Sequence, residues 1–166
     1  DEIGETCGIA IPNGTEMIYY DRVQTEWPLQ IHLQVGSHTP SWCTASGKLY
    51  LSSIIKDRRV RLINKLPLKQ YTRNTITDAN ILEEELQGIK KSGVGTDNEE
   101  FVDGMVACAV PVYDAKGRLF ACLFTHAPVI RKSLHELLHY VPTLAKAAKE
   151  LSCLIDEADG DSKNSD

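Results

Sequence analysis

The chain has 166 residues, of which 42% are hydrophobic and 25% are charged, and this composition suits one globular domain with a sizeable core. Its formal net charge of -5 argues against a nucleic-acid surface, because duplex binding depends on Lys and Arg neutralising phosphates. No apolar run approaches the roughly 20 residues that cross a bilayer, and Asp1-Glu2 opens no basic and then apolar leader, so we expect a cytoplasmic protein without a membrane partner.

The start of the chain is predicted to form β-strands. Residues 6–11 and 17–23 are rich in β-formers and flank Asn13-Gly14, a dipeptide that predicts a tight hairpin. Residues 29–35 alternate apolar and polar side chains, which predicts a third strand with His32 on its outer face.

Three helices are expected in the middle of the chain. The first covers residues 47–55, and the second covers residues 57–66, where Pro67 ends it. The third has Asp78 as its cap and stops at Gly93, after an apolar stripe and two lysines.

The last part of the chain predicts two strands and then a helix. Residues 101–113 and 119–125 are joined by a turn-rich connector and should pair as a hairpin. Ser133 and Glu136 form a capping box for the final helix, which Pro142 should kink or restart. The predicted fold class is therefore α/β, in the α+β sense, with an antiparallel sheet flanked by helices.

The end of the chain is expected to lie outside the fold. Residues 156–166 are acidic and have little to bury, so a disordered tail is predicted there. Residues 1–155 would then form the single domain.

One string of residues suggests an alternative function, a zinc-dependent metallohydrolase. The pattern H-E-x-x-H runs from His135 to His139, and two His on one helix face could hold zinc with Glu136 as a general base. Both His, however, project about 120° or more from the apolar stripe of the helix. Pro142 and Ala145 stand where the extended motif carries Gly and a third His. A solvated helix face, with Glu136 in the cap, is the expected structure.

A cysteine nucleophile would be a second route to an enzyme. The five cysteines are odd in number, scattered and expected to be mostly buried free thiols: Cys7, Cys43, Cys108, Cys122 and Cys153. Cys122 and His126 would lie about 13 Å apart along an extended strand, too far for a hydrogen bond. We therefore expect no enzymatic activity, no cofactor and no metal.

The segment Ala45-Ser46-Gly47-Lys48 predicts a helix start that could receive an anion. If the helix begins there, the amides of Ser46, Gly47 and Lys48 point outward at the positive end of the helix dipole. Gly47 would let a ligand approach the backbone, which makes a seat for a carboxylate. The alternative is an ordinary helix start with Thr44 or Ser46 as its cap.

Several short signatures, in one order, carry a family resemblance. In chain order they are Gly4-Glu5-Thr6, Asp21-Arg22-Val23, Pro40-Ser41-Trp42-Cys43-Thr44-Ala45-Ser46-Gly47-Lys48, Gly93-Val94-Gly95-Thr96-Asp97-Asn98-Glu99-Glu100, Gly104 and Ala109-Val110-Pro111-Val112. From about Ile3 to Cys153 the chain resembles the C-terminal effector-binding domain of IclR-type transcriptional regulators. The resemblance implies a GAF-like sensor fold that assembles into a homodimer or homotetramer. It also implies a winged helix-turn-helix domain that would precede Asp1 and through which alone DNA would be bound.

The same resemblance implies a pocket for a small organic acid effector. Its matching positions, together with neighbours on the same loop and strand face, are Thr44, Ala45, Ser46, Asp97, Ala107, Cys122, Phe124 and His126. Members that recognise very small oxo acids tend to have small hydroxyl residues where Phe124 and His126 stand. An aromatic or hydroxylated aromatic acid is therefore expected, with its ring stacked on the wall and Asp97 accepting from a hydroxyl.

Overall fold

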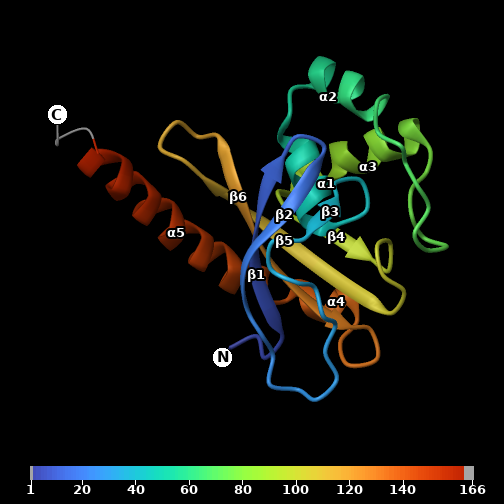
Figure 1. Cartoon of the computed structure of the whole chain (residues 1–166), viewed down its shortest axis with the longest axis horizontal. Coiled ribbons are helices and arrows are strands. Elements are labelled where there is room, and N and C mark those ends of the chain that lie inside the picture. The colour runs from blue at the N-terminus through green and yellow to red at the C-terminus, as the bar shows by residue number, and fades with distance from the viewer. Residues whose placement is uncertain (1, 163–166) are drawn as a thin grey trace.

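The computed structural model describes residues 2–162 and has three layers, with a six-stranded antiparallel sheet between two groups of helices (Figure 1). The sheet order is β3-β2-β1-β6-β5-β4. The elements are β1 (Thr6–Asn13), β2 (Glu16–Val23), β3 (His38–Pro40), α1 (Ala45–Ser53), α2 (Lys56–Ile63), α3 (Ala79–Ser92), β4 (Gly95–Asn98), β5 (Met105–Tyr113), β6 (Leu119–Pro128), α4 (Leu134–Leu138) and α5 (Val141–Ser162). This architecture confirms the predicted antiparallel sheet flanked by helices.

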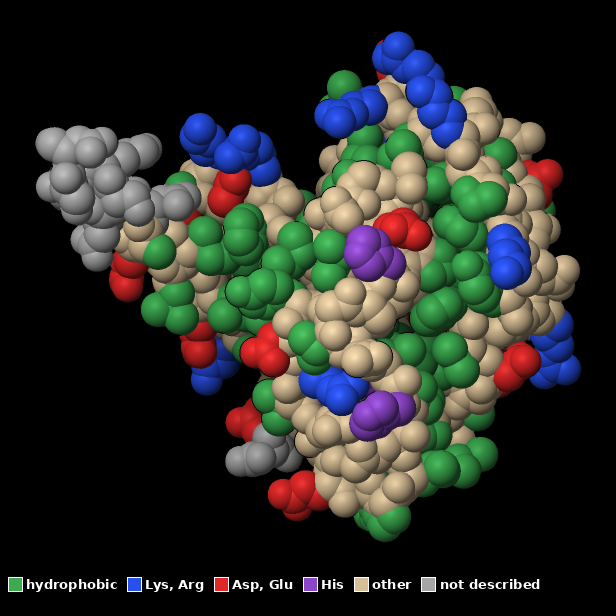
Figure 2. All heavy atoms as spheres, viewed as in Figure 1, with side chains coloured by type: hydrophobic (Ala, Val, Ile, Leu, Met, Phe, Trp, Pro, Cys, Tyr) green, Lys and Arg blue, Asp and Glu red, His purple; other side chains and the backbone are tan. Residues whose placement is uncertain are grey.

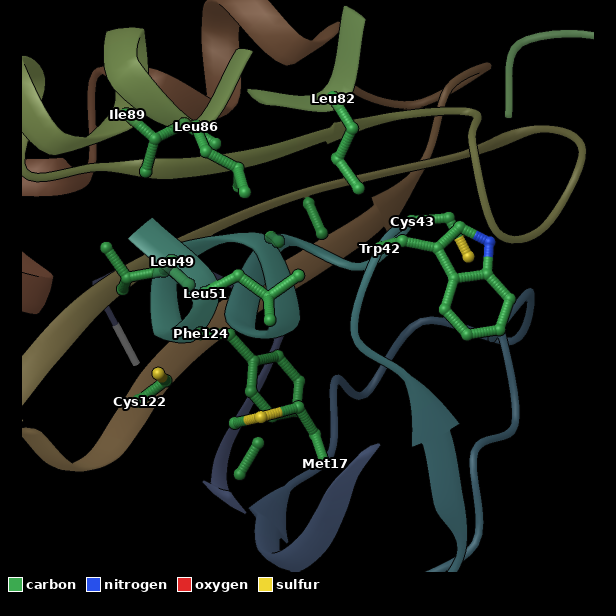
Figure 3. Close-up of a cluster of buried hydrophobic side chains, with 14 of the residues drawn as sticks. Met17, Trp42, Cys43, Leu49, Leu51, Leu82, Leu86, Ile89, Cys122 and Phe124 are labelled. Carbon is green, nitrogen blue, oxygen red and sulfur yellow. The ribbon is translucent and has the colours of Figure 1, made fainter. Parts of the chain in front are cut away.

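The central strands β5 and β6 bury both of their faces, because each face packs against a different group of helices. On one face, side chains such as Ala109 and Phe124 pack against α1, behind which α3 lies (Figure 3). On the other face, Val110 and Leu123 pack against α4 and α5. Alternation along each strand therefore divides the interior into two cores.

Local signals in the sequence correctly placed three helix ends. The Asp78 side chain accepts hydrogen bonds from the amides at the start of α3, and Gly93 ends that helix in the left-handed conformation at φ 71°. The capping box of Ser133 and Glu136 is present at α4. Pro142 falls in the first turn of a new helix, α5, where a missing N–H costs no hydrogen bond.

The predicted strand at residues 29–35 is wrong. These residues have no regular structure, and the strand that pairs with β2 is β3, with Met17 opposite Thr39. The alternating segment buries too little to be held as a strand, since Leu29 and Val35 stay about half exposed. His32 is exposed, as expected.

Two further boundaries differ from the prediction. The segment after α3 forms a short strand, β4, and turns at Gly104 before β5 begins at Met105, so the strand expected from residue 101 begins later. Residues 156–162, in the segment for which a disordered tail is predicted, continue α5 as helix to Ser162. Residues 163–166 of the expected tail lie outside the described residues.

Helix α5 begins on the sheet and extends beyond it (Figure 1). Among its side chains up to residue 158, the last buried one is Ala148, and Leu154 further along is 61% exposed. Within residues 2–162, no helix is both long enough and apolar enough to span a membrane.

Candidate functional site

A small cavity lies where the start of α1 faces the sheet, and seven of the eight predicted site residues line it: Thr44, Ala45, Ser46, Asp97, Ala107, Phe124 and His126. Tyr19 and Met105 complete the lining. The pairing explains the convergence, since Ala107 lies opposite both Asp97 on β4 and His126 on β6. The cavity leaves about 10 Å³ for the centres of water-sized molecules, which is room for about one water.

The eighth predicted residue, Cys122, lies behind the cavity. Its side chain is fully buried, and its thiol donates to the carbonyl of Ser46 at 3.5 Å. Burial raises the pKa of this thiol well above its usual value. Cys122 therefore supports the start of α1 and is poorly suited to act as a nucleophile.

The cap of α1 leaves fewer free amides than the sequence suggested. The Thr44 hydroxyl accepts from the Gly47 amide at 3.2 Å, and the Thr44 carbonyl accepts from the Lys48 amide at 2.9 Å. Only the amides of Ala45 and Ser46, in the first turn, lie outside the hydrogen-bonding pattern of the helix. The free amides at this helix start are therefore those of residues 45 and 46, and not those of residues 46–48 as expected.

Gly47 serves packing rather than ligand approach, which corrects its predicted role. A Cβ atom at Gly47 would lie 2.4 Å from the Ser41 Cα atom and 2.5 Å from the Thr44 hydroxyl. The backbone of the preceding loop therefore occupies the space that a ligand was expected to use. Gly95 on β4 is similar, because its Cβ would lie 2.1 Å from the Ala45 carbonyl oxygen. Both glycines fix the start of α1 against its surroundings.

Asp97 presents an unsatisfied oxygen to the cavity. Its side chain is fully buried, and Oδ1 accepts from the Glu100 amide at 2.7 Å. Its Oδ2 atom has no hydrogen-bond partner within the described part of the chain. Burial raises the pKa of this carboxyl to about 7, and the nearby charge of Glu100 acts in the same direction. Near neutral pH, Asp97 can therefore either donate or accept a hydrogen bond.

A buried lysine lies beneath this acidic loop. Lys48 is fully buried, and its Nζ atom donates to Glu100 at 2.8 Å and to Glu85 on α3 at 3.0 Å. These ion pairs join α1, α3 and the loop after β4. The lysine faces carboxylates of the protein and is not left free for a ligand.

An aromatic wall closes the cavity on the sheet side. The rings of Tyr19 and Phe124 have their centroids 5.0 Å apart, and the ring of His126 stacks on Phe124 at 6.0 Å with a 15° interplanar angle. Gly8 on β1 provides the space for Phe124, since a Cβ there would lie 2.6 Å from the ring. The flat ring of a ligand could take the place of one of these protein rings, so that the remaining rings stay buried.

His126 is a second unsatisfied polar group at this wall. Its side chain is only 5% exposed, and Nδ1 has no partner among residues 2–162. Burial lowers its pKa to about 4, so the imidazole is neutral near pH 7 and can offer one donor and one acceptor. Asp97 and His126 thus provide the cavity with polar groups that carry little charge.

Two lining residues were missed from sequence. Met105 lies two residues before Ala107 on β5, so strand alternation could have placed it on the same face. Tyr19 could have been found from its alternation with Met17, which aims both side chains at one face of β2. The role of Tyr19 depends on the pairing of β2 with β1, which brings it beside Phe124.

The residues of the H-E-x-x-H string lie on an exposed surface and not in a cavity. His135, Glu136 and His139 are exposed, and the two imidazole centroids are 4.9 Å apart. The Glu136 carboxylate accepts from both the amide and the hydroxyl of Ser133 at 2.7 Å, so the cap uses it. Throughout residues 2–162, no group of three or more His, Cys, Asp or Glu side chains is arranged to hold a metal.

Comparison with known proteins identifies relatives over almost the whole chain. The family profile described as "Bacterial transcriptional regulator IclR C-terminal" matches residues 1–153. The probable transcriptional regulator SauR of Cupriavidus necator is 42% identical over 151 residues, which are 91% of this chain and 60% of that protein. The chain therefore spans less than two thirds of this curated relative.

Two solved structures with 28% identity share the fold. The C-terminal domain of Escherichia coli KdgR aligns with a TM-score of 0.80, over 92% of this chain and 88% of that one. The inducer-binding domain of PobR from Acinetobacter, a double mutant in complex with 3-hydroxy benzoic acid, aligns with a TM-score of 0.82 over 91% and 89%. Both proteins are named as transcriptional regulators or transcription factors.

Proposed function

Because this chain belongs to the IclR family of bacterial transcriptional regulators, as a C-terminal domain, we propose that it is the effector-binding and oligomerisation part of such a regulator. The observation that carries the proposal is the convergence of two unsatisfied buried groups, Asp97 Oδ2 and His126 Nδ1, on the cavity at the start of α1. Buried polar atoms normally have partners, so their convergence favours a ligand that supplies one.

The effector that fits this lining is an organic carboxylic acid with an aromatic or hydroxyaromatic body. The amides of Ala45 and Ser46, at the positive end of α1, suit the carboxylate. Phe124 suits the ring, and Asp97 suits a hydroxyl group. The related PobR domain was solved with 3-hydroxy benzoic acid, which agrees with this class of ligand.

Ligand binding would shift the domain between two arrangements. The cavity as it stands has room for about one water, so an aromatic acid must displace the rings of Tyr19 or Phe124. These rings belong to β2 and β6, and β6 also packs against α5 on its other face. The effector would increase the population of an opened arrangement, which binds it more tightly than the closed one does. Symmetric assembly would transmit this change of conformation to the DNA-reading domains.

The remaining parts of this proposal concern the whole protein. A winged helix-turn-helix domain would precede Asp1 and would make the only contacts with DNA, and the regulator would work in the cytoplasm without catalysing a reaction. The domain would associate as a dimer or tetramer through the projecting α5 and the outer strands.

A thermal-shift experiment with organic acids tests the site. We expect at least one of benzoate, 3-hydroxybenzoate and 4-hydroxybenzoate to stabilise the protein, by about 1–3 kcal/mol at saturation. Phe124→Ala and Asp97→Ala should lose most of that shift. Phe120→Ala and Asp103→Ala are matched controls, because both residues are exposed or half-exposed and lie outside the cavity.

Two outcomes would contradict the proposal. If Phe124→Ala and Asp97→Ala bind the acid as the unchanged protein does, the pocket lies elsewhere. If no acid stabilises the unchanged protein, the ligand class is wrong. Circular dichroism of each variant establishes whether a lost shift reflects lost binding or lost folding.

A further inference from the structure

A β-bulge in β2 aims a charged side chain at the interior of the domain. The pairing of β1 with β2 shifts between Ile9 and Ala10, so that Ala10 lies opposite Tyr19 while Ile9 lies opposite Asp21. Simple alternation from Tyr19 would aim Asp21 at the sheet face that holds Phe124. Because the bulge inserts one residue, Arg22 faces that side instead, opposite Gly8.

Arg22 lines a second small cavity, which adjoins the first. Its lining also includes Thr6, Asp21, Leu33 and Val35, and it shares three wall residues with the first cavity: Tyr19, Phe124 and His126. Gly8 on β1 pairs with Arg22 on β2 at one side and with Phe124 on β6 at the other, and the Phe124 ring lies over Gly8. The two cavities are thus compartments on either side of one aromatic partition. Displacement of Phe124 or Tyr19, which an aromatic ligand already requires, would join them.

The second compartment offers a cation that is not neutralised. Arg22 donates one hydrogen bond, from Nη1 to the Leu33 carbonyl, out of the five that a guanidinium can make. In the described part of the chain, no ion pair joins Arg22 to a carboxylate. Asp21 also lines this compartment, and its Oδ1 atom accepts from the backbone amide of Arg22 at 2.8 Å, not from the guanidinium. The buried Glu5 is already held by Arg131 at 2.7 Å.

We propose that the effector is an acid with two anionic ends, one held at the amides of Ala45 and Ser46 and the other at the guanidinium of Arg22. This inference rests on the proposed effector site and specifies the class of ligand that it takes. His126 lines both compartments, and its unsatisfied Nδ1 atom can form a hydrogen bond with the part of the ligand between the two anionic ends. A guanidinium binds a carboxylate through two parallel hydrogen bonds, which favours a second carboxylate over a neutral group at this end.

Pairs of ligands that differ in a single negative charge measure the contribution of the second anionic end to affinity. The probes are benzene-1,3- and benzene-1,4-dicarboxylate and the straight-chain dicarboxylates from succinate to suberate, each beside its monomethyl ester. Isothermal titration should find at least one diacid that binds about tenfold or more tightly than its ester. In Arg22→Gln protein the preference should be lost, so that the diacid binds no better than its ester.

Two further variants define the role of Arg22. Arg22→Lys keeps the charge but removes the planar fork, so it should retain part of the preference for the diacid. Arg118→Gln, in the exposed turn between β5 and β6, removes the same charge far from the cavity and should behave as the unchanged protein.

The outcomes separate this inference from the proposed function. If single acids such as benzoate bind but no diacid is preferred, or if Arg22→Gln leaves the preference intact, the second anionic end is wrong and the effector site stands. If neither single acids nor diacids bind the unchanged protein, the proposed function is wrong as well.

Discussion

At the scale of single residues, the site combines two ionisable groups whose pKa values are shifted by the same burial in opposite ways. Asp97 holds its proton up to a pKa of about 7, compared with the ordinary value of 3.8, and His126 stays neutral down to a pKa of about 4, compared with 6.5. Both side chains are neutral over much of the range between pH 4 and 7. The charged groups near Asp97 are Lys48 and Glu100, and the neighbouring Tyr19 and Cys43 have pKa values raised by burial.

The two groups should therefore change stability with pH in opposite directions. Asp97 binds its proton more tightly in the folded state, so its contribution is complete below pH 3.8 and is lost as the pH rises through about 7. His126 binds its proton less tightly in the folded state, so its contribution is complete above pH 6.5 and is lost as the pH falls through about 4. Between these limits the two slopes nearly cancel.

Single substitutions should reveal how each group changes the free energy of unfolding with pH. Relative to the unchanged protein between pH 4.5 and 6.5, the free energy of unfolding of Asp97→Asn should rise with pH by about 1.4 kcal/mol per unit, and that of His126→Gln should fall by a similar amount. Urea unfolding at three pH values measures both. Curves that run parallel to that of the unchanged protein would show that these groups titrate normally in the fold.

At the scale of elements, local signals were predictable from sequence, whereas features that depend on a distant partner were not. Asn13-Gly14 and the cap at Asp78 act within a few residues, so each could be read directly. Residues 29–35 have the pattern of a strand, but β3 occupies the edge of β2, and no pattern in the segment itself reveals this. The shared cavity wall on β5 and β6 was predictable because strand alternation fixes which side chains share a face, whereas the expected positions at residues 44–46 and at Asp97 came from the family resemblance. Arg22 escaped because the bulge breaks that alternation, and Tyr19 escaped because its place beside Phe124 depends on the pairing of β2 with β1.

The role of Gly47 leads to a prediction at the same scale. Gly47→Ala should destabilise the domain by about 1–3 kcal/mol, because the new methyl group meets the backbone of Ser41, which cannot move without disturbing the cap of α1. Chemical denaturation measures the change. Gly88→Ala on α3 is the matched control: nothing lies within 4 Å of its Cβ position, and the substitution should stabilise the helix by about 0.5–1 kcal/mol. Equal effects at the two sites would show that close packing at Gly47 has no role.

At the scale of the whole molecule, the projecting half of α5 carries an exposed apolar surface (Figures 1 and 2). Hydrophobic side chains gather over this helix in the space-filling view, and Leu154 is 61% exposed. Its 22 residues give a length of about 33 Å, and the sheet covers only the first part. A self-complementary contact between two such helices would bury this stripe.

We expect the domain to sediment as a dimer or tetramer at tens of micromolar, on the order of ordinary biophysical concentrations. Leu154→Asp should shift it towards monomer, because a charge would then be buried in the contact. Ile81→Asp, at a side chain that is 56% exposed on α3, should leave assembly unchanged. A monomer in the unchanged protein would assign oligomerisation to another part of the regulator. Tight duplex binding by this chain alone would contradict the proposed division of labour.

The bulge in β2 also has an evolutionary consequence. The sign of the charge beside Phe124 is determined by one residue of hydrogen-bond register, since a regular strand with the same sequence would bring Asp21 opposite Gly8 in place of Arg22. One residue inserted beside Tyr20, with the bulge retained, would place Asp21 opposite Gly8 and turn the Arg22 side chain to the other face of the sheet. When relatives are aligned in order to compare ligand preference, the placement of a one-residue gap in this hairpin is as informative as any substitution in the pocket.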